Sequence, residues 1–156
     1  MAIVYIASNT TYDEGIHPEV TMIMYRKGKI GSFFLGNRFP NLKELDCHRL
    51  NLTELPLECP SLERLECDHN NLEHLRLECP QLRYLKCNHN CLKSIVLNCP
   101  FLNEILCDNN PLDNLNGLEF CEDLRYIECS DKLRASVILL KTMLPKIKAS
   151  FLVDQP

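Results

Sequence analysis

Ten cysteines and five histidines are the residues of this 156-residue chain whose side chains are best suited to chemistry. Thiol and imidazole groups bind metal ions, and they act as nucleophiles or bases; thiols also form disulfides. Nine of the cysteines fall into two regular series, and Cys91 stands outside both. The first series is Cys47, Cys67, Cys87, Cys107 and Cys129, and the second is Cys59, Cys79, Cys99 and Cys121.

The regular spacing of the cysteines favours a structural role. Successive cysteines recur mostly at alternating distances of 12 and 8 residues, which follow a repeat and not the close ligand pairs of zinc sites. Side chains stacked on neighbouring strands have Cβ atoms about 4.8 Å apart, whereas a disulfide needs about 3.5–4.5 Å. We therefore predict unpaired thiols that fill a narrow core. Disulfides between units and a thiol-bound metal are the alternatives.

Three histidines and two aspartates recur close together in successive units, so a metal site is conceivable there. They are His48, His69, His89, Asp68 and Asp108. Stacked polar columns are ordinary in repeat proteins, and we expect no metal and no cofactor. The chain has no G-x-S-x-G, P-loop, H-E-x-x-H or G-x-G-x-x-G motif. Cys91 beside histidines is a weak nucleophile candidate, so we expect no enzyme and assign no catalytic residue.

An internal repeat determines the elements that hold these residues. Pro40, Pro60, Pro80 and Pro100 mark units of 20 residues. The unit from Pro60 reads PSLERLECDHNNLEHLRLEC, and the unit from Pro80 reads PQLRYLKCNHNCLKSIVLNC. We divide the single domain into a capping segment at 1–17, a degenerate repeat at 18–39, four regular repeats at 40–121, a partial repeat at 122–134 and a cap at 135–156.

The shared pattern L-x-x-L-x-C-x-x-N-x-L resembles the leucine-rich repeat, and the resemblance covers residues 18–134. It is most similar to the cysteine-ladder variety, known in internalin-like bacterial surface proteins and abundant in large DNA viruses of amoebae. The resemblance implies a right-handed α/β solenoid with a parallel sheet on its concave face. The short unit predicts an extended or 3₁₀ convex side. A helix capped by Ser130 or Asp131 and running to about Leu144 is expected to cap the C-terminal end.

One position of the repeat carries an asparagine, directly after each expected strand. The amides of Asn70, Asn90 and Asn110 can satisfy backbone groups left open at that turn. We predict a structural asparagine ladder here, beside a structural cysteine ladder formed by the first cysteine series.

The residues that flank the inward leucine and cysteine of each strand are expected to point outward. The predicted binding residues are Met22, Met24, Glu44, Asp46, His48, Arg64, Glu66, Asp68, Tyr84, Lys86, Glu104, Leu106, Tyr126 and Glu128. The resemblance implies a non-enzymatic interaction module that binds an unknown protein partner through this concave face. The alternatives are a self-assembling homodimer joined at the N-terminal edge strand and, less favoured, a thiol-based metal or redox protein.

Composition argues against other classes of partner. The chain carries 17 Lys and Arg against 21 Asp and Glu, a net charge of −4, which disfavours nucleic-acid and membrane-surface binding. Its apolar runs are far below the roughly 18 residues that a membrane span needs. No basic segment precedes a long apolar run, so no signal peptide is expected. Many unpaired thiols fit a reducing, intracellular compartment, either of the source cell or of a host cell.

Overall fold

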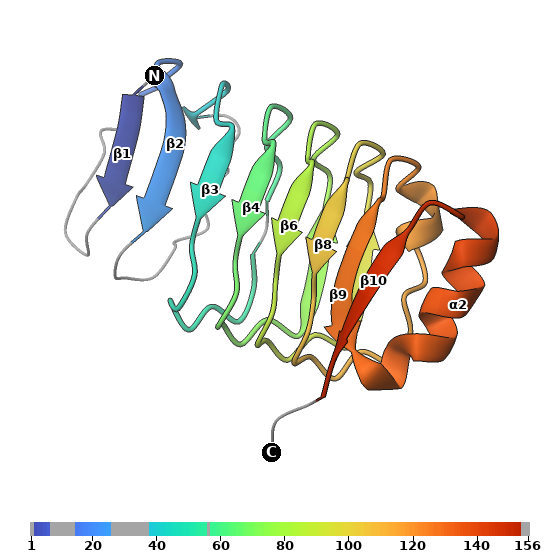
Figure 1. The fold of residues 1–156 in the computed structure, drawn as a ribbon. Helices are drawn as coiled ribbons and strands as arrows, with labels where there is room; N and C mark the ends of the chain where they lie inside the picture. Colours follow the sequence, from blue (N-terminus) through green and yellow to red (C-terminus); the bar gives the residue numbers. More distant parts are fainter. Residues whose placement is uncertain (1, 7–14, 26–37, 56, 154–156) are drawn as a thin grey trace.

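The computed structural model of the protein describes residues 2–6, 15–25, 38–55 and 57–153. Within these ranges eight strands pair in parallel and lie side by side in one sheet, in the order β1-β2-β3-β4-β6-β8-β9-β10 (Figure 1). Their bounds are β1 Ala2–Ile6, β2 Val20–Tyr25, β3 Glu44–Asp46, β4 Arg64–Glu66, β6 Tyr84–Lys86, β8 Glu104–Leu106, β9 Tyr126–Ser130 and β10 Lys148–Leu152. The sheet is open at both ends in this part of the chain, which gives a repeat-like α/β fold.

Each repeat unit contributes one short strand to this sheet. The strands β3, β4, β6 and β8 contain three residues each, and the middle residue is buried. These middle residues, Leu45, Leu65, Leu85 and Ile105, pair in register from unit to unit. The repeat predicted from the sequence is therefore confirmed as a repeating parallel sheet. Because one such strand buries little surface alone, the stability of each unit depends on its neighbours.

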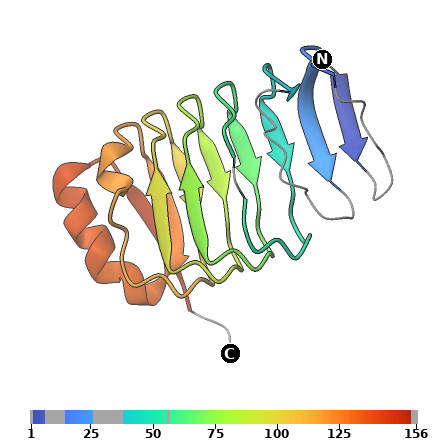
Figure 2. The same cartoon turned by 180° about the vertical axis from the view of Figure 1, so that it is seen from behind.

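The chain returns behind the sheet in extended and 3₁₀ segments. β5 (His74–Leu77) and β7 (Ser94–Leu97) form a second parallel sheet, which lies in front in the view from behind (Figure 2). An isolated bridge joins Leu57 to Leu77. In the unit from Pro100 the return contains the 3₁₀ turn η1 (Leu118–Phe120), preceded by Gly117 in the left-handed region at φ 97°.

The core between the sheet and the returning segments contains both cysteine series. All nine of these cysteines are at most 1% exposed, Cys91 is exposed, and all ten thiols are unpaired. Burial among apolar side chains raises the pKa of each of the nine thiols. It brings the pKa to about 12 at Cys59 and Cys121. The buried thiols are therefore neutral and poorly nucleophilic at ordinary pH.

Replacing Cys87 tests whether this column is dry. Cys87 is fully buried, so Cys87→Ser places a hydroxyl in apolar surroundings and should lower the free energy of unfolding by about 1–3 kcal/mol. Cys87→Ala removes only the sulfur and should cost less. Urea unfolding of the two variants and the wild type measures the difference. Equal stability of the serine and alanine variants would mean that water reaches the column.

The asparagine at the turn after each strand binds backbone groups of two successive units. Asn70 Oδ1 accepts from the backbone N–H groups of Leu50 and Leu52, both at 3.0 Å. Asn70 Nδ2 donates to the carbonyl oxygens of Cys47 and Cys67 at 3.0 and 2.9 Å. One and two units further on, Asn90 and Asn110 donate to the equivalent pairs of carbonyl oxygens, and the Oδ1 atom of each accepts from one backbone N–H, that of Leu72 or Leu92. All three asparagines are buried, so these amides join neighbouring units inside the core.

The C-terminal segment differs from the expectation in two ways. A 3₁₀ turn, η2 (Asp131–Leu133), follows β9, and the helix α2 begins only at Arg134 and ends at Met143. The Asp131 carboxylate accepts from the Arg134 guanidinium, and no side chain caps either helical segment. After the helix, β10 pairs with β9 in parallel, a strand that the sequence reasoning missed. α2 lies at the C-terminal end of the array (Figure 1) and buries Val137 and Leu140.

At the N-terminal end, β1 pairs with β2, and β2 pairs with β3. Val20, Ile23 and Tyr25 of β2 are buried, as expected of the first half of a degenerate repeat. Residues 26–37 of that repeat and residues 7–14 of the expected capping segment lie outside the described residues.

Candidate functional site

Two rows of side chains cover the solvent-facing surface of the sheet, and we call them together the outer sheet face. The first row is Met22, Glu44, Arg64, Tyr84, Glu104, Tyr126 and Lys148, and the second is Met24, Asp46, Glu66, Lys86, Leu106, Glu128 and Ser150. Every one of these residues is partly exposed. They alternate with the buried middle residues of the strands, because successive side chains of a strand point to opposite faces. The structure thus brings most of the predicted binding residues onto one surface.

An Arg–Glu–Tyr cluster occupies the middle of the outer sheet face. Arg64 Nη2 and Nε donate to Glu66 Oε1 at 2.5 and 3.0 Å. The guanidinium carbon of Arg64 also lies 3.8 Å from the centroid of the Tyr84 ring, a cation–π contact. Burial raises the pKa of the Tyr84 hydroxyl, and the positive charge of Arg64 opposes that shift. These contacts fix the positions of the three side chains relative to one another and give the cluster a large planar surface.

Carboxylates lie on both sides of this cluster. Toward the N-terminal end, Glu44 and Asp46 of β3 stand beside Met22 and Met24 of β2 and line a hollow of about 80 Å³. Toward the C-terminal end, Glu104 of β8 is in register between Tyr84 of β6 and Tyr126 of β9.

Glu128 completes the second group of carboxylates and is paired in register with Leu106. Asp46 contacts His48 Nδ1 at 2.5 Å. Among the described residues, no lysine or arginine forms an ion pair with Glu44, Glu104 or Glu128.

The positions just after the strands form a polar edge of the sheet. At one of them, Asp68, the side chain does not lie where the sequence predicted. Asp68 was expected to point outward, but it is only 4% exposed, because the turn after β4 folds it against the next unit. Lys86 Nζ lies 3.4 Å from Asp68 Oδ1 and compensates its charge without a well-directed hydrogen bond. Asp108, in the equivalent place two units later, is buried as well. These two carboxylates therefore belong to the scaffold more than to the exposed surface.

His69 and His89 stack on each other along the same edge. Their ring centroids are 4.3 Å apart and their planes differ by 7°. Burial, the neighbouring His89 and Arg49 lower the pKa of His69. Both histidines have positive φ, 54° and 51°, as do Arg49 and Asn109 at equivalent positions of other units. The turn that carries the asparagine ladder therefore sets their orientation.

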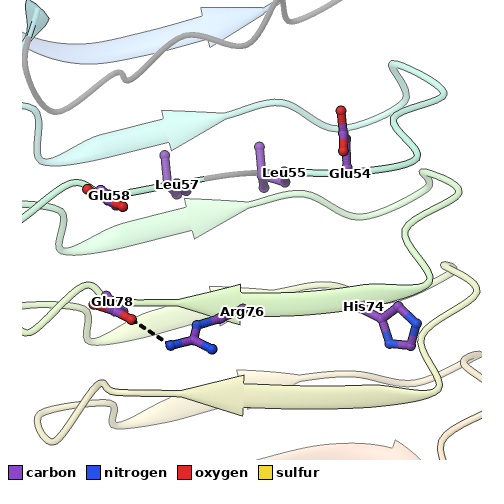
Figure 3. Close-up of a pocket in the computed structure, with 7 residues that line it drawn as sticks. All are labelled: Glu54, Leu55, Leu57, Glu58, His74, Arg76 and Glu78. Atoms are coloured by element: carbon purple, nitrogen blue, oxygen red, sulfur yellow. Dashed lines mark hydrogen bonds and ion pairs between the residues drawn. The ribbon is translucent and has the colours of Figure 1, made fainter.

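A larger hollow, of about 350 Å³, lies on the returning side of the array, and sequence reasoning missed it (Figure 3). Its floor is Leu55 and Leu57, and Arg76 Nη2 donates to Glu78 Oε1 at 3.0 Å on its rim. The other lining residues are Glu54, Glu58 and His74. The sequence marks this unit as different from the later ones, since Pro56 stands where they have Arg76 and Val96. The lining charged side chains are exposed, so water screens them.

Comparisons with known proteins, and searches of the described residues for metal sites and membrane helices, gave no match. No protein-family model matches this chain, and no curated protein matches it in sequence. Over the described ranges, no three His, Cys, Asp or Glu side chains are grouped so that they could hold a metal ion. In the same part of the chain, no helix is long and apolar enough to cross a membrane.

Proposed function

We propose that this protein is a non-enzymatic interaction module that binds a protein partner through the outer sheet face. The observation that carries the proposal is the Arg64–Glu66–Tyr84 cluster, held on strands β4 and β6, whose middle residues are buried. Tyrosine and arginine dominate the energetic centres of protein interfaces. Here both are partly exposed, and their positions are already set by the contacts between them.

The surroundings of the cluster support recognition of a protein more than catalysis of a reaction. Methionine and tyrosine side chains extend the apolar contact area on both sides, and carboxylates surround them. The nine buried thiols have raised pKa values, which makes them poor nucleophiles. We assign no catalytic residue and no cofactor on this basis.

The scaffold that we propose is a right-handed leucine-rich repeat solenoid of the cysteine-ladder type. The buried cysteines at the ends of the strands and the asparagine contacts at the turns support it. In this proposal the outer sheet face is the concave surface, and the helix α2 with β10 caps the C-terminal end. The unpaired thiols support a reducing, intracellular location.

A capture experiment with matched variants tests the proposed function. The wild type, Arg64→Glu/Tyr84→Ala and a control pair on the returning side, His74→Ala/Arg76→Glu, are immobilised and exposed to an extract of the source cell. Circular dichroism first establishes that all three are folded. We expect the outer-face variant to weaken a specific partner's binding at least about 30-fold, which is about 2 kcal/mol. The control variant should retain the partner. Retention by the outer-face variant would contradict the proposal.

Self-association is the second candidate function, because β1 and β10 end the described sheet and each pairs with one neighbouring strand. Exposed edge strands readily pair with another chain. Light scattering at tens of micromolar distinguishes this candidate from the first. A dimer that Met24→Lys dissociates would favour assembly at the N-terminal end, whereas a monomer would count against it.

A further inference from the structure

Two groups of residues on the outer sheet face each combine carboxylates with apolar or aromatic side chains, and they lie at opposite sides of the central cluster. Subsite A consists of Met22, Met24, Glu44 and Asp46, and subsite B consists of Glu104, Leu106, Tyr126 and Glu128. Each contains two carboxylates from neighbouring positions and two apolar or aromatic side chains. Each belongs to a pair of adjacent strands, β2 with β3 and β8 with β9.

The carboxylate of Glu44 has an opposite charge on the adjacent strand but forms no ion pair with it. Glu44 pairs in register with Arg64. The Arg64 guanidinium instead contacts Glu66 and lies over the ring of Tyr84, one strand further on. The described cation nearest in register to Glu44 is therefore held by other residues. The hollow beside Glu44 is lined by the two methionines on one side and by Arg64 and Glu66 on the other.

Glu104 likewise forms no ion pair with a described lysine or arginine, although its neighbours differ from those of Glu44. It stands in register between Tyr84 and Tyr126, and its negative charge helps to raise the pKa of the Tyr84 hydroxyl. Lys148 of β10 pairs in register with Tyr126, but no described cation makes a cation–π contact with the ring of Tyr126, which is partly exposed. A carboxylate beside a free aromatic face attracts a cation both by charge and through the ring.

We infer that the outer sheet face recognises an extended protein segment with two Lys or Arg side chains, one for subsite A and one for subsite B. This inference rests on the proposed function and names the class of partner. Long basic side chains fit the two subsites because their aliphatic stems pack on methionine, leucine or tyrosine while their heads meet the carboxylates. Five carboxylates against three cations, Arg64, Lys86 and Lys148, still give the whole face a net negative charge that complements a basic segment.

The strand order determines the spacing of the two basic residues. Glu44 and Glu104 occupy the same row, and β4 and β6 lie between their strands. Three steps of about 4.8 Å separate them by about 14 Å. An extended chain advances about 3.4 Å per residue, so residues i and i+4 span the same distance. Residues i and i+4 of an extended chain also point to the same side, so both basic side chains can face the sheet.

Fluorescence anisotropy with synthetic peptides tests the inference. Two labelled peptides of equal composition are compared, Gly-Ser-Lys-Ser-Ala-Ser-Lys-Ser-Gly with its lysines at i and i+4, and Gly-Ser-Lys-Ser-Lys-Ser-Ala-Ser-Gly with its lysines at i and i+2. We expect the wider spacing to bind about tenfold more tightly, because only that peptide reaches both subsites. Glu44→Gln and Glu104→Gln should each remove most of this preference. Glu54→Gln, on the returning side, should leave it unchanged.

Three outcomes would overturn the inference. Equal binding of the two peptides would mean diffuse attraction to an acidic surface, and persistence of the preference in both Gln variants would place the site elsewhere. No binding of either peptide would exclude a basic segment. In each case, a captured partner that Arg64→Glu/Tyr84→Ala releases would leave the proposed function standing. If that variant also retains the partner, the proposed function fails independently.

Discussion

Raising the pH from about 8 to about 10 will unfold this protein, because nine cysteines are buried as neutral thiols in its core. Burial raises the pKa of these thiols in the folded state, to about 11 at Cys99 and Cys129 and to about 12 at Cys59 and Cys121. In the unfolded chain the same groups ionise with a pKa of about 8.5. The thiols therefore contribute stability that is fully present below about pH 8.5 and is lost as the pH rises toward the folded-state pKa.

The expected loss is large because the nine thiols act together. Each ionising thiol favours the unfolded chain by about 0.8 kcal/mol at pH 9 and about 1.4 kcal/mol at pH 9.5. Nine of them sum to about 8 and about 13 kcal/mol, against a total stability of about 5–15 kcal/mol for an ordinary domain. The unfolding midpoint should therefore fall between about pH 9 and pH 10. Burial also raises the pKa of Tyr25 to about 12, which adds to the loss at the upper end.

Urea unfolding at a series of pH values, in a phosphine reductant, measures this dependence. Cys87→Ala/Cys107→Ala removes two buried thiols, so its free energy of unfolding should fall less steeply with pH. The slope of that free energy against pH should correspond to about two fewer protons released on unfolding. Cys91→Ala is the matched control, because this thiol is exposed and its removal should leave the slope unchanged. A stability that stays constant between about pH 8 and pH 9.5 would show that the thiols are not held neutral in the core.

Replacing Asn90 by alanine will lower the free energy of unfolding by about 3 kcal/mol, at the upper end of the cost of leaving buried polar groups without partners. Asn90 Oδ1 accepts from the Leu72 N–H at 3.1 Å, and Asn90 Nδ2 donates to the carbonyls of Cys67 and Cys87 at 3.1 Å each. Alanine leaves these groups unsatisfied in a site that is 8% exposed. Because the contacts join two units, the loss weakens the stacking between β4 and β6 as well as one turn.

Asn71→Ala provides the control for this prediction. Asn71 follows Asn70 in the preceding unit and is exposed, so its truncation should change stability by less than about 0.5 kcal/mol. Thermal and urea unfolding of both variants give the comparison. If Asn90→Ala were as stable as Asn71→Ala, water would have to make the hydrogen bonds of the lost amide. The turn would then be open to water and not a water-free contact between units.

The C-terminal end shows where sequence reasoning was incomplete. The repeat stops after β9, and the sequence reasoning predicted a helix running to about Leu144 but not the strand that follows it. β10 exists because Lys148–Leu152 pairs with Tyr126–Ser130 through backbone hydrogen bonds. Such pairing depends on a strand more than twenty positions away, and it leaves little trace in a local pattern.

The period of the sequence alone determined the main architecture of this protein. Equal spacing makes equivalent residues stack in register, and alternation along a strand sends leucines inward and charged residues outward. The tertiary structure decided how positions that are equivalent in the repeat differ in burial and in contacts. Asp68 is buried although its spacing placed it on the surface, and Arg64 contacts Glu66 and Tyr84 instead of Glu44. Several partners lie within reach of each such side chain, and only the packed units determine which contact has the lowest free energy.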